Sequence, residues 1–431
     1  MIKKIIRTLI TVFLVLISFI AKIPKASVKS KFETLDDNVD IRFSVISDIH
    51  ISLYKLQEIE RLNEVFSTMY SLDPRMKAIA IVGDLTDNGF ELEYNTVKSI
   101  IDKNKKSETE LIASMGNHEG NTASLFKEIT GKNPKENLII NGYHFITISP
   151  HSSEEEYGGS TYNLDEEWLK KQLDEATKEN PKKPIFVFMH HGIKNTVCGT
   201  DLWNTNDLSE IFNNYPQVIH FSGHSHYPLN DPKSIYQNTF TALNTSTISY
   251  FELDQDMMYG SIPPNSRNAS QMMVVEVEGS VVKIKRLDLL SRKYIGPDWI
   301  INTSKGVEDF KYTKDRKDKS KEPYFDKDNK LEINDVSNVT CQIKIGQAKI
   351  KEDDDIVYSY KYDFKNVKTG EIDKSYKISS EFYLIPTPEF IIQKFEGLNP
   401  NTQYEVIVTA YNAYGKRSYN KLSGIFQTEN I

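Results

Sequence analysis

Two pairs of side chains in this sequence have the spacing expected of residues that grip one cation. Asp48 and His50 form a D-x-H pattern, and His224 and His226 form an H-x-H pattern. In an extended chain, side chains two positions apart point to the same side, so each pair can bind one ion. Each pattern alone is weak evidence, because aspartates and histidines are also common in loops.

Three further motifs supply the residue types that such a site needs. They are Asp84 in GDLTD, Asn117 and His118 in GNHE, and the pair His190-His191. Asp84 can use both carboxylate oxygens, one for each of two ions, and Asn117 offers a neutral carbonyl oxygen. His190 stands at a strand edge and is the better ligand of its pair. His118, next to a ligand but not itself coordinated, is free to act as an acid.

These motifs need a scaffold, and the hydrophobic pattern predicts one. Apolar runs at residues 41–47, 78–82 and 110–114 read as buried strands, separated by helical spacing at residues 55–70 and 90–103. The same alternation continues with strands at 143–149, 184–189 and 217–221, helices at 165–179 and 206–214, and a hairpin at 272–277 and 281–287. Strand and helix in alternation indicate an α/β fold.

Every motif directly follows one of the predicted strands. In open α/β sheets, the carboxyl ends of the strands form the edge where ligands bind. The coincidence therefore predicts a shared metal site, and the structural alternative of unrelated loop residues is disfavoured. A mixed set of imidazole, carboxylate and amide donors suits two divalent ions such as Mn, Fe or Zn. The predicted ligands are Asp48, His50, Asp84, Asn117, His190, His224 and His226.

The order D-x-H, G-D-x-x-D, G-N-H-E, H-H and G-H-x-H resembles the calcineurin-like metallophosphoesterase superfamily over residues 41–290. The resemblance implies a two-sheet α/β sandwich flanked by helices. It also implies a division of the ligands between two metals. One metal would be held by Asp48, His50, Asp84 and His226, and the other by Asp84, Asn117, His190 and His224. The purple acid phosphatases, which carry Tyr three residues after the motif's Asp, are disfavoured because that position is Asp87.

The resemblance implies hydrolysis of phosphate esters, with a phosphodiester or nucleotide substrate slightly favoured over a monoester or pyrophosphate. Two cations lower the pKa of a bridging water and stabilise charge on the attacking and leaving oxygens. The resulting hydroxide attacks phosphorus in line, and His118 protonates the leaving alkoxide. Asp87 and Glu119 are left open at this stage, either as positioning residues or as residues without a special role.

The N-terminus predicts export. Basic residues precede an apolar run at residues 9–21, and Ala26 offers a small side chain for cleavage. We therefore expect a signal peptide at residues 1–26 and a secreted or cell-surface protein. An uncleaved N-terminal anchor is the alternative, because membrane spans begin at about 17 residues.

Composition restricts the partners. Removing residues 1–26 takes away five basic residues and no acidic ones, which moves the net charge from −7 to −12. An acidic protein of this kind has no general attraction for nucleic acid. The abundance of Lys, Asn and Ile is typical of an AT-rich bacterial source.

A second domain follows a change in composition. Residues 41–302 are expected to form the metallophosphoesterase domain, and the mostly charged residues 303–330 to form a linker. Residues 331–431 alternate in the manner of strands and predict an all-β immunoglobulin-like sandwich. Within it, residues 398–404 (LNPNTQY) resemble the tyrosine corner of a fibronectin type III module, although the usual early Trp is absent; Tyr358 or Tyr360 is expected in its place.

Two rival functions fit parts of the sequence. One is a cell-surface binding protein with an inactive phosphoesterase-like domain, whose C-terminal module contacts glycan or protein. Inactive relatives are expected to lose a ligand or the acid histidine, and here all are present. The other is a structural metal domain, which would not need His118.

Overall fold

The computed structural model describes residue 35 and residues 38–119, 123–149, 164–202, 208–351 and 355–430. The expected signal peptide or anchor at residues 1–26 lies outside the described residues. Within the described part, no helix has the length and apolar character needed to cross a bilayer.

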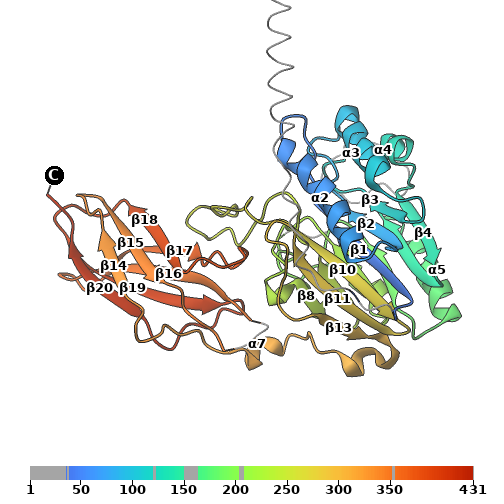
Figure 1. The fold of residues 1–431 in the computed structure, drawn as a ribbon. Helices are drawn as coiled ribbons and strands as arrows, with labels where there is room; N and C mark the ends of the chain where they lie inside the picture. Colours follow the sequence, from blue (N-terminus) through green and yellow to red (C-terminus); the bar gives the residue numbers. More distant parts are fainter. Residues whose placement is uncertain are drawn as a thin grey trace, which may run out of the picture. The chain divides into compact units, whose positions relative to one another are not determined.

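A first mixed sheet of seven strands carries three of the motifs (Figure 1). Its order is β12-β11-β10-β1-β2-β3, with β13 paired to β11. Strands β1, β2 and β3 run parallel, and β10 runs antiparallel to β1. The bounds are β1 (Ile41–Ile46), β2 (Ala78–Val82), β3 (Glu110–Ser114), β10 (Gln271–Glu278), β11 (Val281–Asp288), β12 (Lys293–Tyr294) and β13 (Trp299–Asn302).

A second sheet of six strands carries the other two motifs. Its order is β4-β5-β6-β7-β9-β8; β5, β6, β7 and β9 are parallel, while β4 and β8 are antiparallel edge strands. The bounds are β4 (Lys135–Ile140), β5 (Tyr143–Ile148), β6 (Ile185–Phe188), β7 (Val218–Ser222), β8 (Ile235–Gln237) and β9 (Thr241–Asn244).

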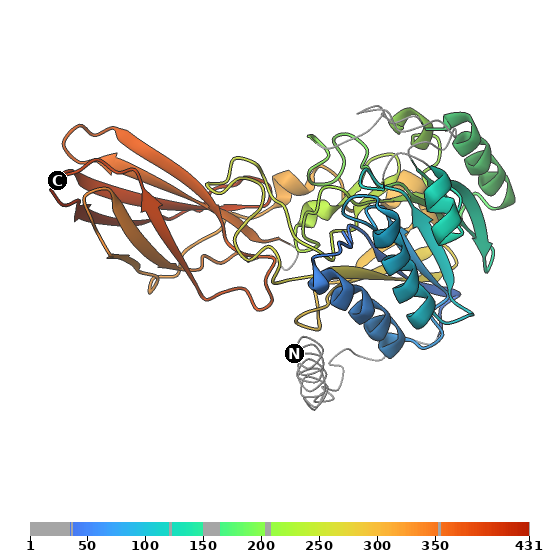
Figure 2. The same cartoon turned by 90° about the horizontal axis from the view of Figure 1, so that it is seen from above.

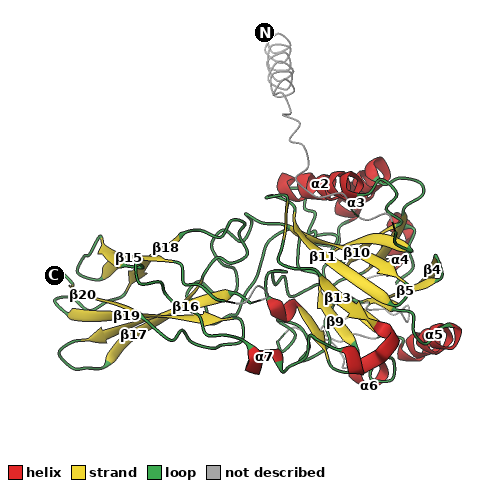
Figure 3. Ribbon diagram, turned by 60° about the horizontal axis from the view of Figure 1, so that its bottom comes forward, coloured by secondary structure: helices red, strands yellow, loops and turns green. Residues whose placement is uncertain are grey.

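The two sheets pack face to face, with helices on both outer faces (Figures 1 and 3). Phenylalanines fill the space between the sheets: the ring of Phe43 lies 5.0 Å from those of Phe145 and Phe186. The helices covering the first sheet are α2 (Leu56–Leu72), α3 (Glu91–Asn104) and α4 (Ala123–Thr130), and those covering the second are α5 (Glu166–Glu179) and α6 (Ser209–Phe212). The two-sheet sandwich flanked by helices is thus confirmed.

Two segments differ from the sequence expectation. Residues 227–270, for which the sequence predicted no helix or strand, contain η1 (Pro232–Ser234) and the short strands β8 and β9, which extend the second sheet. Residues 303–330, expected to be a linker without regular structure, contain η2 (Thr303–Asp309) and α7 (Arg316–Lys319). The Arg316 guanidinium donates to the carbonyl oxygen of Pro232 at 2.8 Å, so this connection is held against the second sheet's surface.

The C-terminal module is all-β, as expected (Figure 2, orange and red). Three strands form one sheet in the order β14-β15-β18, and four form another in the order β17-β16-β19-β20. The bounds are β14 (Leu331–Asn334), β15 (Thr340–Gly346), β16 (Val357–Asn366), β17 (Ile372–Ser379), β18 (Phe390–Glu396), β19 (Gln403–Asn412) and β20 (Leu422–Gln427).

The module contains the tyrosine corner that the sequence suggested. The Tyr404 hydroxyl accepts a hydrogen bond from the backbone N–H of Asn399 at 3.2 Å, which is the contact that defines this corner. Tyr360 lies fully buried in the core of the module, whereas Tyr358 belongs to a different apolar cluster. Of the two tyrosines, Tyr360 is therefore the one that packs in the core of the module.

Candidate metal centre

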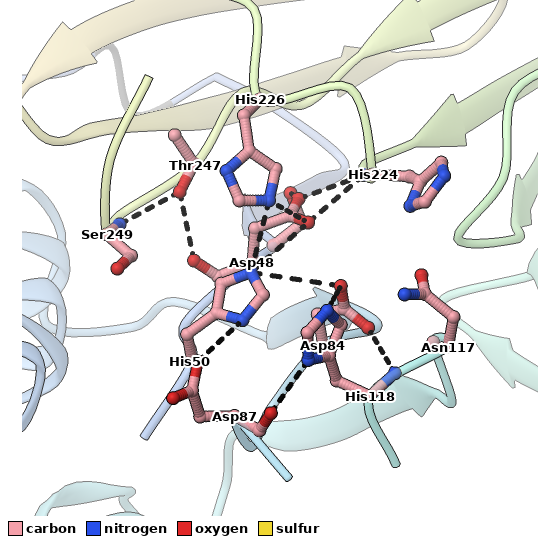
Figure 4. A network of polar contacts seen from close by, with 12 residues as sticks. Asp48, His50, Asp84, Asp87, Asn117, His118, His224, His226, Thr247 and Ser249 are labelled. Carbon is pink, nitrogen blue, oxygen red and sulfur yellow. Dashed lines mark hydrogen bonds and ion pairs between the residues drawn. The ribbon is translucent and has the colours of Figure 1, made fainter. Parts of the chain in front are cut away.

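The five motifs meet because the carboxyl ends of both sheets lie at the same edge of the sandwich. Asp48, Asp84 and Asn117 follow β1, β2 and β3 of the first sheet, while His190 and His224 follow β6 and β7 of the second. The backbone N–H of His224 donates to the Asp48 carboxylate at 3.1 Å, which ties the two sheets together at the site (Figure 4).

A first group of buried ligand atoms joins Asp48, His50, Asp84 and His226, all within 4.8 Å of one another. His226 Nε2 lies 3.0 Å from Asp48 Oδ1 and 3.1 Å from His50 Nε2. Asp84 Oδ2 lies 3.8 Å from His50 Nε2. This group contains the four residues that the resemblance assigned to one metal.

A second group joins His190, His191 and His224, again within 4.8 Å. His190 Nε2 lies 3.2 Å from Asn117 Oδ1 and 3.1 Å from Asp84 Oδ2, so the amide and the shared carboxylate face this group too. The sequence favoured His190 over His191. The structure also places His191 here, with its ring stacked at 3.9 Å on that of His224.

Asp84 lies between the two groups, but it uses its oxygens differently from the expectation. Its Oδ1 accepts a hydrogen bond from the backbone N–H of His118 at 3.0 Å. Its Oδ2 faces both groups, at 3.1 Å from His190 Nε2 and 3.8 Å from His50 Nε2. A single oxygen, rather than one oxygen per metal, is therefore directed at both groups.

The histidine tautomers show that the donor set fits metal ions. His226 Nδ1 lies 2.9 Å from the Tyr250 carbonyl oxygen, and His190 Nδ1 lies 2.8 Å from that of Val82. Because a carbonyl can only accept, each of these Nδ1 atoms carries a proton, and each Nε2 is the nitrogen that faces the site. The Nε2 atoms of His50, His190 and His226 converge on two carboxylates, where a cation can take the place of Nε2 protons.

The pKa shifts of the site residues also indicate a cation site. Burial opposes ionisation of Asp84, but the neighbouring His190 outweighs it and holds the pKa of Asp84 well below its usual value. Burial lowers the pKa of His190, yet Asp84 and Asp48 overcome it and raise that pKa to about 10. Burial lowers the pKa of His224 to about 3, which keeps its imidazole neutral. The two aspartates thus favour a positive charge at the site, and the neutral imidazole of His224 is available to coordinate a cation.

Five of the predicted ligands adopt left-handed backbone conformations, which is unusual for residues other than glycine. Their φ angles lie between 49° and 67°, and they are Asp48, His50, Asp84, His224 and His226. Each such residue costs about 1–3 kcal/mol unless its surroundings compensate, and such strain clusters at functional sites. The sharp turns after the strands bring these short side chains over the sheet edge.

Glycines before two of the motifs are required by space. A Cβ atom at Gly116 would overlap the Asp84 carboxylate, and one at Gly223 would lie 2.5 Å from Asp48 Oδ2. Both contacts are closer than real Cβ atoms show, so any other residue would displace a ligand.

His118 stands beside the first group and is more open than the ligands. Its Nδ1 lies 2.8 Å from the Asp87 carbonyl oxygen, and its Nε2 lies 4.0 Å from Asp84 Oδ2. Its side chain is 37% exposed, against 0–4% for the side chains of Asp48, His50, Asp84 and His226. The Asp87 carboxylate pairs with Lys55 Nζ at 2.9 Å and faces His50 Nδ1 at 3.5 Å. Ligand atoms of Asp87, His50 and His118 lie within 4.8 Å of one another and form a third group that could hold an ion.

Several positioning residues could not be assigned from the sequence. Glu119, left open there, accepts backbone N–H bonds from Asp84 at 2.8 Å and from Thr86 at 3.1 Å. Thr247 donates to the Asp48 carbonyl at 3.0 Å. Tyr250 supplies the carbonyl that orients His226. Thr247 and Tyr250 follow strand β9. A prediction of β9 would have placed both residues at the sheet edge, but this strand was not predicted.

Residues 41–228 match the family model of the calcineurin-like phosphoesterases. This part of the chain is similar to the calcineurin-like phosphoesterases. The superfamily resemblance seen in the sequence is thereby confirmed. The domain's family is typically dinuclear and metal-dependent, which agrees with the two ligand groups described above.

Two curated relatives share part of this domain. A probable glycerophosphodiester phosphodiesterase from Arcobacter nitrofigilis is 29% identical over 195 residues, and a probable cyclic nucleotide phosphodiesterase from Rhodococcus erythropolis is 25% identical over 197 residues. Each match covers 42% of this chain, and the chain spans 64% of the length of each relative. Among solved structures, purple acid phosphatase PPD1 from yellow lupin seeds is 12% identical with a TM-score of 0.42, over 61% of this chain and 53% of that one.

Proposed function

We propose that this phosphoesterase is an exported two-metal enzyme that hydrolyses phosphate esters, with a phosphodiester or nucleotide as the favoured substrate. The observation that carries the proposal is the pairing of two ligand groups around Asp84 with His118, a partly exposed histidine beside the first group. The names of the two relatives, both phosphodiesterases, support the choice of substrate class.

The site residues have distinct roles in this proposal. Asp48, His50, Asp84 and His226 would hold one divalent ion, and Asp84, Asn117, His190 and His224 the other. Mn, Fe or Zn suits these donors. Two such ions, when bound, supply Lewis acidity toward phosphoryl oxygens and lower the pKa of a bound water.

His118 would deliver a proton to the leaving oxygen. Its Nδ1 is fixed by the Asp87 carbonyl, so its Nε2 is the nitrogen presented to a substrate held at Asp84. Protonated His118 donates from Nε2 and is left neutral, with the proton retained at Nδ1. The exposed edge of the ring gives a leaving group access that the buried ligands do not have.

The test is hydrolysis by the full chain reconstituted with Mn, Fe or Zn, on a panel of a phosphomonoester, phosphodiesters and nucleotides. His118→Ala should lose about 10²–10⁴-fold in kcat, because general acid catalysis contributes about that factor, while metal content stays unchanged. His144→Ala is the matched control, since this histidine on β5 contacts Glu179 of α5 at 3.1 Å and belongs to none of the ligand groups.

The outcomes separate the hypotheses. Full activity of His118→Ala on every substrate would show that the acid is another group. Wild type that binds metal but cleaves nothing would favour the alternative, a cell-surface binding protein whose C-terminal module contacts glycan or protein. The complete ligand set and the preserved His118 speak against that alternative.

Export is the remaining part of the proposal, and it is supported by the basic head and apolar run of residues 1–26. Mass spectrometry of protein recovered from outside the cell tests it. An exported chain that still begins at residue 1 and stays with the membrane fraction would contradict cleavage and favour the anchor.

A further inference from the structure

The segment after the last ligand motif runs from the metal centre to the C-terminal module. We call residues 250–264 the bridge segment. Its Tyr250 carbonyl accepts from His226 Nδ1 at 2.9 Å, and its Glu252 N–H donates to the His226 carbonyl at 3.2 Å. The bridge segment therefore holds both the ring and the backbone of His226. It lies beyond residue 228, where the match to the phosphoesterase family ends.

Lys377, on strand β17 of the C-terminal module, binds the bridge segment through two ion pairs. Its Nζ lies 3.1 Å from Asp254 Oδ2 and 2.8 Å from Asp256 Oδ1. The other oxygen of Asp254 accepts the Tyr227 hydroxyl at 2.9 Å. Since Tyr227 is the neighbour of His226 in the chain, polar contacts run without a gap from the module to the residue next to a ligand.

Backbone contacts fix the same segment at two further points. The N–H of Met258 donates to the Lys377 carbonyl at 2.7 Å. The Tyr383 hydroxyl donates to the carbonyl of Pro264 at 2.7 Å. Together with the ion pairs, these bonds hold the bridge segment in its middle and at its far end.

Apolar packing buries the bridge segment against the module. Phe251 and Leu253 are both 0% exposed, and they share one apolar cluster with Tyr358, Phe382 and Tyr383 of the module. The rings of Phe251 and Tyr383 lie 5.6 Å apart. Phe251 directly follows Tyr250, so this packing sets the position of the carbonyl that orients His226.

We propose that the C-terminal module is a positioning element of the metal centre. It fixes the bridge segment, and the bridge segment fixes His226 in the orientation that binds metal. Partners that orient a ligating histidine raise metal affinity, because the ring does not have to be ordered when the ion binds. This inference rests on the proposed two-metal function, and it gives the module a role inside the enzyme.

The test uses the full chain and Mn²⁺ alone. Lys377→Met should weaken binding by about tenfold, within the roughly two- to thirty-fold range of coupling through packed networks. Amide hydrogen exchange at residues 224–228 and 250–259 should become faster. Lys377→Arg keeps the positive charge and should restore both properties.

Two further variants make the test specific. Lys361→Met is the matched control, because Lys361 lies on the neighbouring strand β16 and pairs with Asp363 of its own module at 2.9 Å. It should leave Mn²⁺ binding unchanged. Tyr383→Phe removes the hydroxyl that binds Pro264 but keeps the packed ring, and it should weaken binding about two- to threefold. If circular dichroism shows that Lys377→Met does not fold, the Mn²⁺ affinity of Tyr383→Phe tests the inference in its place.

Each outcome has one meaning. If wild type binds Mn²⁺ and Lys377→Met binds it as tightly with unchanged exchange, the inference is wrong and the proposed function stands. Equal weakening by Lys361→Met would also overturn the inference, because it would reflect general destabilisation. If wild type binds no Mn²⁺, Fe or Zn, the proposed function fails, whereas exchange rates still report whether the module orders residues 224–228.

Discussion

At the scale of residues, Glu119 holds two ligand-bearing loops with one carboxylate. It accepts N–H groups from Asp84 and Thr86 after β2 and from Gly116 after β3. Burial and the nearby Asp84 raise the pKa of Glu119 to about 7, which shows how costly its charge is at this position. The backbone N–H groups around it and the nearby His190 offset part of that cost.

We expect Glu119→Gln to disturb the metal centre without touching a ligand. In this variant an amide NH₂ would face backbone N–H groups whose hydrogen bonds the carboxylate accepted. Two donors would then oppose each other, so the loop carrying Asp84 must shift. Loss of a group that orients a ligand typically costs about 10–100-fold in metal affinity. Calorimetric titration with Mn²⁺ measures it. Exposed Glu108→Gln is the control, and equal affinity of both variants would show that Glu119 does not orient Asp84.

The sequence predicted which residues gather at the site, because strand ends and D-x-H or H-x-H spacing are visible in it. It could not predict how they are held. Glu119 and Tyr250 act on or through backbone groups, which every residue type carries. The use of one oxygen of Asp84 depends on the N–H of His118, which lies 34 positions away in the chain.

At the scale of elements, most strands of the two sheets were predicted from their continuous apolar runs. Strands β8 and β9 were missed because they have only three and four residues and stand among prolines, serines and asparagines. Strand β4 was also missed; it is an edge strand whose side chains are mostly half-buried, so its hydrophobic pattern is weak.

The aromatic layer between the sheets should dominate the stability of the phosphoesterase domain. Phe186 is 0% exposed, and its ring lies 5.0 Å from Phe43 and 5.1 Å from Phe145. Phe186→Ala should lower the free energy of unfolding by about 3–5 kcal/mol. Phe90→Ala, at a side chain that is 59% exposed, should change it by less than about 0.5 kcal/mol. Urea unfolding at fixed metal concentration compares them; similar values would contradict the assignment of this layer as the core.

At the scale of the whole molecule, the contact between module and phosphoesterase domain contains a carboxyl group that prefers to be neutral. Burial, together with the charge of Asp231, raises the pKa of Asp355 from 3.8 to about 6. Asp355 lies on the module and is 9% exposed, whereas Asp231 belongs to the phosphoesterase domain. The sequence predicted the module from its tyrosine corner, but it held no sign of this contact, whose residues are far apart in the chain.

Asp355 should make stability depend on pH. Between about pH 4 and 6 the unfolded chain ionises this group before the folded one does, so stability falls as pH rises. Each pKa unit corresponds to about 1.4 kcal/mol, and screening lowers it, so we expect a loss of about 1–2 kcal/mol. Asp355→Asn mimics the neutral form and should remove this loss. Thermal unfolding of both proteins at pH 4 and pH 7 measures it; a constant difference would contradict the prediction.

The left-handed backbone at five ligands also limits how this metal centre can change during evolution. Asp, Asn, His and Gly tolerate that conformation better than other residues do. Replacement of these ligands by Cys or Glu would therefore strain the turn in addition to altering the metal ligands. The turns at the strand ends thus restrict the site to nitrogen and short-carboxylate donors, and with them to hard and borderline ions, whatever substrate the surrounding loops come to accept.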